Sequence, residues 1–156
     1  MNDTPIAALA VAEQARKTTY PAPFAGVVAG RTKRRLGEHF GITHYGVNLT
    51  QLAPGAASAL PHSHLLEDEF VYVVSGTPVL IIDGEEFTLQ AGDCCGFKAG
   101  TGRAHQLQNR SDGLVTYLEM GNRAPAEEVH YPHHDLKFAT APDGGRRWAH
   151  KDGTPY

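Results

Sequence analysis

Three histidines and one carboxylate are the residues of this sequence best suited to chemistry. His62 and His64 form an H-x-H pair, and Glu69 follows them closely. Side chains at positions i and i+2 of a strand lie on one face, roughly 6.6–6.8 Å apart along it, so two imidazoles can converge on one ion. His105 begins a later apolar segment and adds a third imidazole. The sequence therefore predicts a site for one divalent metal, with four ligands: His62, His64, Glu69 and His105.

The position of Glu69 supports this prediction. Strand alternation places its carboxylate on the same face as Val71 and Val73. A carboxylate buried beside two valines is costly unless something pairs with it, and a divalent cation is a suitable partner. Three neutral imidazoles and one carboxylate suit Zn, Mn, Fe, Ni or Co, with coordination positions left open for substrate. The alternative is a barrel without metal, in which these are ordinary polar strand residues.

Other polar residues are candidates for contact with a substrate. His44 and Asn48 share one face of a predicted strand, and we expect His44 to be the catalytic acid or base and Asn48 to position the substrate. Lys98 and Arg103 are predicted to bind an anionic group of the substrate. The basic run 31–35 is interpreted as a solvated surface, with phosphate or carboxylate binding as the alternative.

The elements that must position these residues are short strands. Segments rich in β-branched and aromatic residues alternate with turns that contain glycine, and Asp83-Gly84 is a strong hairpin signal. This spacing is typical of an antiparallel barrel or sandwich. Strands are predicted over residues 42–53, 69–75, 79–82, 86–89, 94–97, 105–108 and 115–120.

The two ends of the chain are less regular. Residues 1–39 are predicted to form an N-terminal arm, in which Thr4–Arg16 is either a helix capped by Thr4 or an extended segment. The barrel core is expected over about 40–121, and residues 122–156 are interpreted as an irregular tail packed over it. A sheet edge and aromatic strands need cover, so we expect a homodimer, covered by a swapped arm.

Composition excludes several functional classes. The chain has 156 residues, enough for one domain, and a formal net charge of −3, which provides no basic field for nucleic acid or a membrane surface. No apolar run approaches the roughly 20 residues that a membrane helix needs. The first residues lack the basic character of a signal peptide, and the adjacent pair Cys94 and Cys95 is expected to be reduced, so a cytoplasmic location is predicted.

Two segments resemble the two sequence motifs of the cupin superfamily. The first is Gly55-x6-His62-x-His64-x4-Glu69-x6-Gly76, and the second runs from Gly92-Asp93 through Gly100-x4-His105-x3-Asn109. The resemblance implies an all-β, double-stranded β-helix (jelly-roll) barrel and assigns metal binding to the four residues proposed above. The second motif departs from the usual pattern, because Lys98 replaces a proline and two extra residues precede His105.

A wider resemblance covers nearly the whole chain. The segments LGEHFGITHYGVNLTQLAPGA, EDEFVYVVSGTP and HKDGTPY are similar to those of small single-domain bacterial cupins, some of them labelled sugar-phosphate isomerase. This implies a metal-dependent enzyme acting on a small polar or anionic molecule, as an isomerase or epimerase or as a dioxygenase. The competing hypothesis is a non-catalytic small-molecule-binding or sensing cupin.

Overall fold

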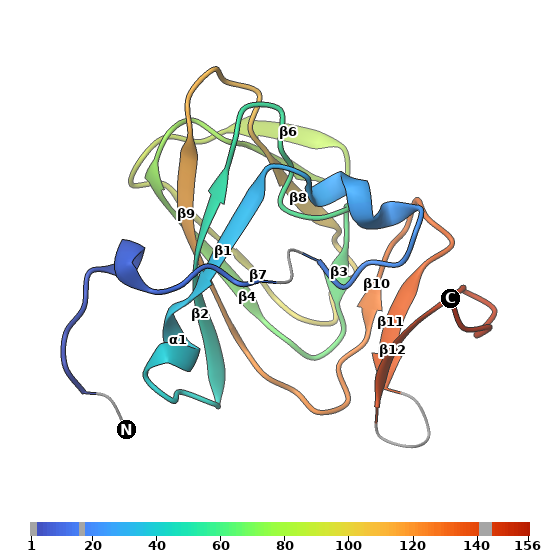
Figure 1. Ribbon diagram of the computed structural model, residues 1–156. Coiled ribbons are helices and arrows are strands. Elements are labelled where there is room, and N and C mark those ends of the chain that lie inside the picture. The colour runs from blue at the N-terminus through green and yellow to red at the C-terminus, as the bar shows by residue number, and fades with distance from the viewer. Residues whose placement is uncertain (1–2, 16–17, 141–144) are drawn as a thin grey trace.

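Antiparallel strands form the body of the computed structural model, which describes residues 3–15, 18–140 and 145–156 (Figure 1). The largest sheet has five strands, in the order β1 (Arg31–Arg35), β2 (Tyr45–Leu52), β9 (Val115–Asn122), β4 (Glu69–Ser75) and β7 (Cys94–Phe97). A second sheet has the order β6 (Glu85–Thr88), β5 (Val79–Ile82) and β8 (His105–Gln108).

The two sheets enclose one apolar core. On β4, Val71 and Val73 are each 1% exposed, whereas Phe70 and Tyr72 face outward, so the strand alternates as its sequence predicts. The buried cluster draws on both sheets and contains Leu52, Ala56, Val71, Leu80, Leu107, Val115 and Tyr117. The all-β barrel prediction is confirmed.

Several local predictions hold closely. The strands expected at 69–75, 79–82, 94–97 and 105–108 have those bounds in the structure. Asp83 and Gly84 have φ of 50° and 89°, the left-handed conformation that a two-residue hairpin turn between β5 and β6 requires. The first barrel strand is shorter than predicted, because β2 begins at Tyr45.

The ends of the chain are more ordered than the sequence suggests. Strand β1 lies in the predicted arm and pairs along its whole length with β2. The predicted tail contains β10 (Val129–His130), β11 (Lys137–Thr140) and β12 (Arg146–Ala149), which form a third sheet with β3 (Ser63–His64). The prediction of an irregular tail is therefore wrong.

A second apolar cluster explains why the tail folds. Its aromatic residues are scattered through a polar sequence, so no strand or helix periodicity predicts that they are buried together. They meet only when the tail packs against residues from the N-terminal part of the chain. Its buried members are Leu60, Val129, Tyr131 and Leu136, against which Tyr20, Phe24, Val27, Phe138 and Trp148 pack.

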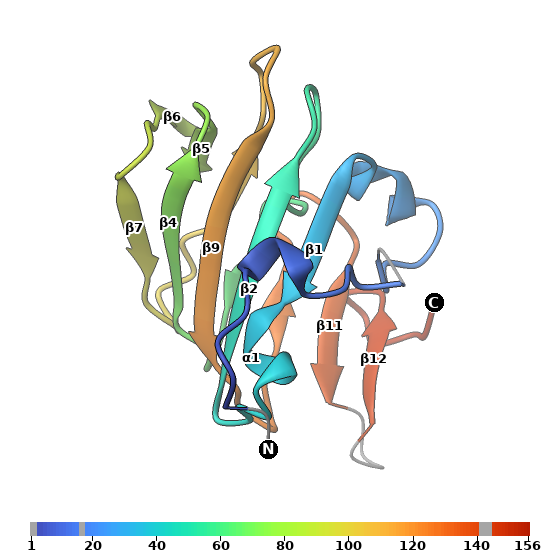
Figure 2. The same cartoon turned by 60° about the vertical axis from the view of Figure 1, so that its left-hand side comes forward.

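The N-terminal arm is mostly extended. Between residues 3 and 15 it has a single 3-10 turn, η1 (Ala8–Ala10), so the helix alternative is wrong over 4–15, while Arg16 lies outside the described residues. The arm lies along the five-stranded sheet of its own chain (Figure 2) and is tied to it by a 2.8 Å hydrogen bond from Gln14 N to Lys33 O. Two short helices, η2 (Phe24–Val28) and α1 (Leu36–His39), flank β1. None of the described helices is long and apolar enough to span a membrane.

The outer face of β4 generates a prediction about assembly. Phe70, Tyr72 and Val74 are 39%, 41% and 45% exposed and form an apolar row on that face. Because a second copy would remove this row from water, we expect light scattering at micromolar concentration to give twice the 16.8 kDa chain mass. Tyr72→Lys should shift the mass toward that of a monomer, and Phe87→Lys on β6 serves as the matched control. A monomeric unmodified protein would contradict the expectation.

Candidate metal centre

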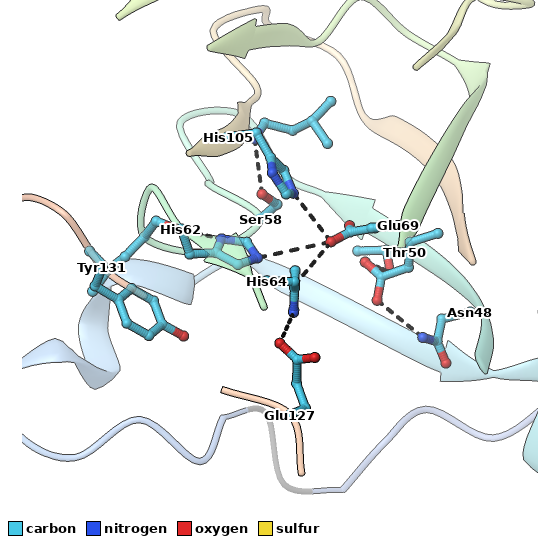
Figure 3. Close-up of polar contacts among 12 residues, drawn as sticks. Asn48, Thr50, Ser58, His62, His64, Glu69, His105, Glu127 and Tyr131 are labelled. Atoms are coloured by element: carbon cyan, nitrogen blue, oxygen red, sulfur yellow. Dashed lines mark hydrogen bonds and ion pairs between the residues drawn. The ribbon is translucent and has the colours of Figure 1, made fainter. Parts of the chain in front are cut away.

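The four predicted ligands come from separate elements that the fold brings together (Figure 3). His64 lies on β3, Glu69 begins β4 and His105 begins β8. His62 precedes β3 and forms a β-bridge with His105, in which His105 N donates to His62 O at 2.8 Å. The backbone therefore holds two of the imidazoles side by side before any metal is considered.

The donor atoms converge on a single carboxylate oxygen. Oε2 of Glu69 lies 3.2 Å from Nε2 of His105, 3.4 Å from Nε2 of His64 and 3.9 Å from Nε2 of His62. Around one ion with metal–ligand bonds of about 2.1 Å, neighbouring donor atoms are about 3.0–3.4 Å apart. His62, Glu69 and His105 offer donor atoms within 4.8 Å of one another, so these three residues fit a transition metal. His64 stands outside this group, but its Nε2 lies near the same carboxylate oxygen and provides a fourth, more distant donor.

The charges of the site are set by burial and by mutual contact. Burial raises the pKa of Glu69, but the imidazoles of His105 and His64 outweigh it and hold this pKa well below its usual range. Burial, with repulsion from His105, lowers the pKa of His62 to about 3. The site thus presents an ionised carboxylate and a neutral imidazole at His62, the protonation states that metal ligation requires.

Neighbouring groups hold the imidazole rings of His62 and His105 in place. Nδ1 of His62 lies 2.8 Å from the Leu60 carbonyl, so the proton belongs on Nδ1 and the lone pair of Nε2 faces the centre. His105 is 2% exposed and stacks on the Phe97 ring, with centroids 3.6 Å apart. These contacts orient two of the ligand rings independently of an ion.

The centre opens into a cleft of about 730 Å³ whose walls are partly polar and partly aromatic. One wall carries Glu119 from β9, whose carboxylate accepts hydrogen bonds from Lys33, from Asn48 at 3.1 Å and from Thr50 at 3.2 Å. Glu119 is not among the site residues predicted from the sequence. Its spacing of two from the buried Tyr117 was the signal that its side chain points inward.

Comparison with known proteins identifies the family. The cupin domain model matches residues 48–121. Over 98% of this chain and 96% of the other, the protein is 35% identical to a sugar phosphate isomerase from a cupin superfamily of Silicibacter pomeroyi, with a TM-score of 0.91. The chain belongs to the cupin superfamily.

Two further relatives share part of this cupin. A cupin protein from Bacteroides fragilis is 30% identical over 60% of this chain and 76% of its own, with a TM-score of 0.52. Quercetin 2,3-dioxygenase of Bacillus subtilis is 35% identical over 74 residues, which are 47% of this chain but only 22% of that enzyme's length.

Of the four residues predicted to contact substrate, one lies in the cleft and three lie outside it. Asn48 lines the cleft of the cupin. His44 is exposed, precedes β2 and lies outside the cleft, and Lys98 and Arg103 are also exposed and outside it, with Arg103 paired to Asp83. The positions of His44, Lys98 and Arg103 differ from the predictions. Those predictions required a strand that already included His44 and a cavity mouth beside Lys98.

The basic run behaves differently from its interpretation as a solvated surface. Alternate residues of β1, namely Arg31, Lys33 and Arg35, line the cleft. Arg34 points the other way and pairs with Glu13 of the arm at 2.8 Å. The surface interpretation is therefore wrong for Arg31 and Lys33, whereas Arg35 lines the cleft but remains exposed, as expected.

We predict one transition metal per chain. Elemental analysis of untagged protein should show it, and replacing His62 and His64 together with Ala should abolish binding, because half of the donor set is lost. The matched control replaces His130 and His133, both exposed, with Ala. Full metal occupancy in the His62→Ala, His64→Ala variant would reject the assignment.

Gly121 provides a second test of the centre. It pairs with Glu69 across β9 and β4, and a Cβ at this position would lie 2.5 Å from the Asp68 carbonyl oxygen. Gly121→Ala should therefore displace the start of β4 and weaken metal binding about 10-fold or more, as measured by competition with a chelator. Gly96→Ala on β7 meets nothing closer than 3.8 Å and should bind normally. Equal affinities in the two variants would show that the close approach at Gly121 does not position Glu69.

Proposed function

We propose that this cupin is a metal-dependent isomerase or epimerase whose substrate is a small polyhydroxylated anion such as a sugar phosphate. The observation that carries the proposal is a metal centre that opens into a polar cleft with cationic side chains on its walls. The Silicibacter pomeroyi relative, a sugar phosphate isomerase by name, aligns over nearly the whole of both chains and supports it.

The cleft has a metal end and a cationic end joined by aromatic rings. Tyr131 stacks beside His62, with centroids 5.9 Å apart, and Trp148 lies 5.9 Å from Tyr131. The ring centroids of Trp148 and Phe138 are 4.5 Å apart. The guanidinium of Arg146 lies 4.6 Å from the centroid of the Phe138 ring. A sugar could rest its apolar face on these rings, with its anionic group toward Arg146 and its carbonyl toward the metal.

Arg31 strengthens the cationic character of this cleft. Its guanidinium donates to the carbonyl of Ser58, which fixes it on the cleft wall. Its positive charge acts to lower the pKa of the Tyr20 and Tyr131 hydroxyls, which shows that Arg31 lies near the aromatic rings. Arg31 and Arg146 come from opposite ends of the chain, and together they favour an anion over a neutral ligand.

The proposed reaction needs groups that move protons. A bound metal would supply Lewis-acid polarisation of the substrate carbonyl and hydroxyl. Glu119 is the carboxylate on the cleft wall suited to take a proton from one carbon and return it to the next. Burial, with the negative charge of Glu119, raises the pKa of Tyr117 well above its usual range, so this hydroxyl stays protonated and does not act as a base. Glu119 thus takes the role that the sequence suggested for His44.

A dioxygenase is the second candidate. The same donor set would suit iron with open positions for oxygen and substrate, and the chain is 35% identical to quercetin 2,3-dioxygenase over 74 residues. The charged cleft favours the isomerase over this alternative, because an aromatic substrate would leave Lys33, Glu119 and Arg146 without a role.

Isomerisation by proton transfer has a direct readout. Protein loaded with Mn or Zn should exchange a substrate C–H with deuterium from D₂O when incubated with a panel of sugar phosphates, followed by NMR. Oxygen uptake by the iron-loaded protein without any such exchange would favour the dioxygenase. Absence of both reactions, with ligand binding retained, would favour a non-catalytic binding protein.

Variants assign the roles within the cleft. Glu119→Gln should reduce kcat by roughly 100-fold or more with unchanged metal content, because a general base is lost. Arg146→Gln should raise KM about 10-fold with kcat largely retained, because an ionic contact to the substrate is lost. His44→Ala, outside the cleft, is the matched control and should behave as the unmodified protein. Unchanged kcat in Glu119→Gln would remove it from the mechanism.

A further inference from the structure

Glu127 is a buried carboxylate that neither the cupin motifs nor the proposed reaction explains. It lies just before β10, outside residues 48–121, and its side chain is 0% exposed. A charge removed from water in this way is costly unless other groups satisfy it. Its contacts should therefore reveal its role.

Backbone groups hold the Glu127 carboxylate in place. Oε1 accepts from Leu65 N at 2.9 Å, and Oε2 accepts from Leu66 N at 2.8 Å. Leu65 and Leu66 directly follow the ligand His64, and Val129 pairs with His64 across β10 and β3. The carboxylate is therefore rigidly positioned relative to one metal ligand.

The imidazole of His64 lies between two carboxylates. Its Nε2 is 3.4 Å from Glu69 Oε2 in the metal centre, and its Nδ1 is 3.3 Å from Glu127 Oε1 on the opposite side (Figure 3). Nδ1 is buried and makes no hydrogen bond with well-formed geometry among the described residues. A small rotation of the ring would turn the 3.3 Å contact into such a bond.

We infer that Glu127 is a positioning residue that accepts the Nδ1 proton of His64 and aims the Nε2 lone pair at the metal. Ligating histidines usually donate their second ring N–H to a carboxylate or carbonyl, which fixes the tautomer and raises the basicity of the ligand. In this cupin the Leu60 carbonyl is the acceptor for the second ring N–H of His62, and Glu127 is the corresponding acceptor for His64. The inference rests on the metal centre but not on the reaction.

A second metal site is the competing explanation. His64, Glu67 and Glu127 offer donor atoms within 4.8 Å of one another. However, both oxygens of Glu127 already accept backbone hydrogen bonds, and Glu67 Oε1 accepts from Ala124 N at 2.9 Å. This favours a hydrogen-bond partner over an ion ligand, and a ratio of two metal ions per chain would overturn the inference.

Metal affinity tests the positioning role. Glu127→Gln keeps the shape of the side chain, and we expect its zinc affinity, measured by chelator competition, to fall about 10- to 100-fold. The visible spectrum of the cobalt-loaded variant should also change, because the His64 ring reorients. Glu128→Gln, at the exposed neighbouring position, is the matched control and should show neither effect. A lower thermal midpoint of the metal-free protein with unchanged zinc affinity would mean that Glu127 only ties down the backbone, and would overturn the inference.

A double-mutant cycle shows whether the effect passes through His64. In the His64→Ala background, Glu127→Gln should cause no further loss of zinc affinity, and a full additional loss would contradict the inference.

If Glu127→Gln does not fold, the unmodified protein still provides the test. Nitrogen-15 NMR of the zinc-loaded protein should show His64 protonated at Nδ1, and protonation at Nε2 would overturn the inference. These measurements need no turnover, so an inactive protein would refute the isomerase proposal and leave this one standing.

Discussion

The partial burial of Glu69, whose side chain is 21% exposed, is the constraint on which the rest of this cupin depends. Glu69 begins strand β4, and the next two inward-facing residues of that strand, Val71 and Val73, belong to the apolar core. The charge is tolerated because three imidazole nitrogens lie within 3.9 Å of one of its oxygens. Those imidazoles come from segments before and within two other strands, so the barrel must close correctly before the charge is satisfied.

The cleft above the centre is built from matched charges. Lys33 pairs with Glu119, while Arg35 and Arg123 both pair with Glu38. The Lys33–Glu119 pair is partly buried and neutralises charge inside the cleft, whereas the pairs with Glu38 are exposed at its rim. The interior therefore suits a hydrophilic substrate, in contrast to the apolar core below it.

The C-terminal segment adds a wall to the cleft of the common scaffold. The matched cupin domain contains all four candidate metal ligands, but Tyr131, Arg146 and Trp148 lie beyond it and form the aromatic and cationic wall of the cleft. Glu127 belongs to the same segment and contacts the candidate ligand His64 from outside the centre. Because superfamily members share the centre and differ in chemistry, specificity is expected to reside in such added walls.

The sequence by itself determined the strands and singled out the candidate metal ligands, because both depend on local spacing. Alternation of apolar residues sets the face of Glu69, and the H-x-H spacing sets two imidazoles on one side. Only the tertiary structure decided the rest. Contacts such as Glu127 with His64 join residues 63 positions apart, and no local period encodes them. The basic β1 strand, the tail aromatics and Glu119 likewise gained their roles from pairing between distant segments, and the same packing left His44 outside the cleft.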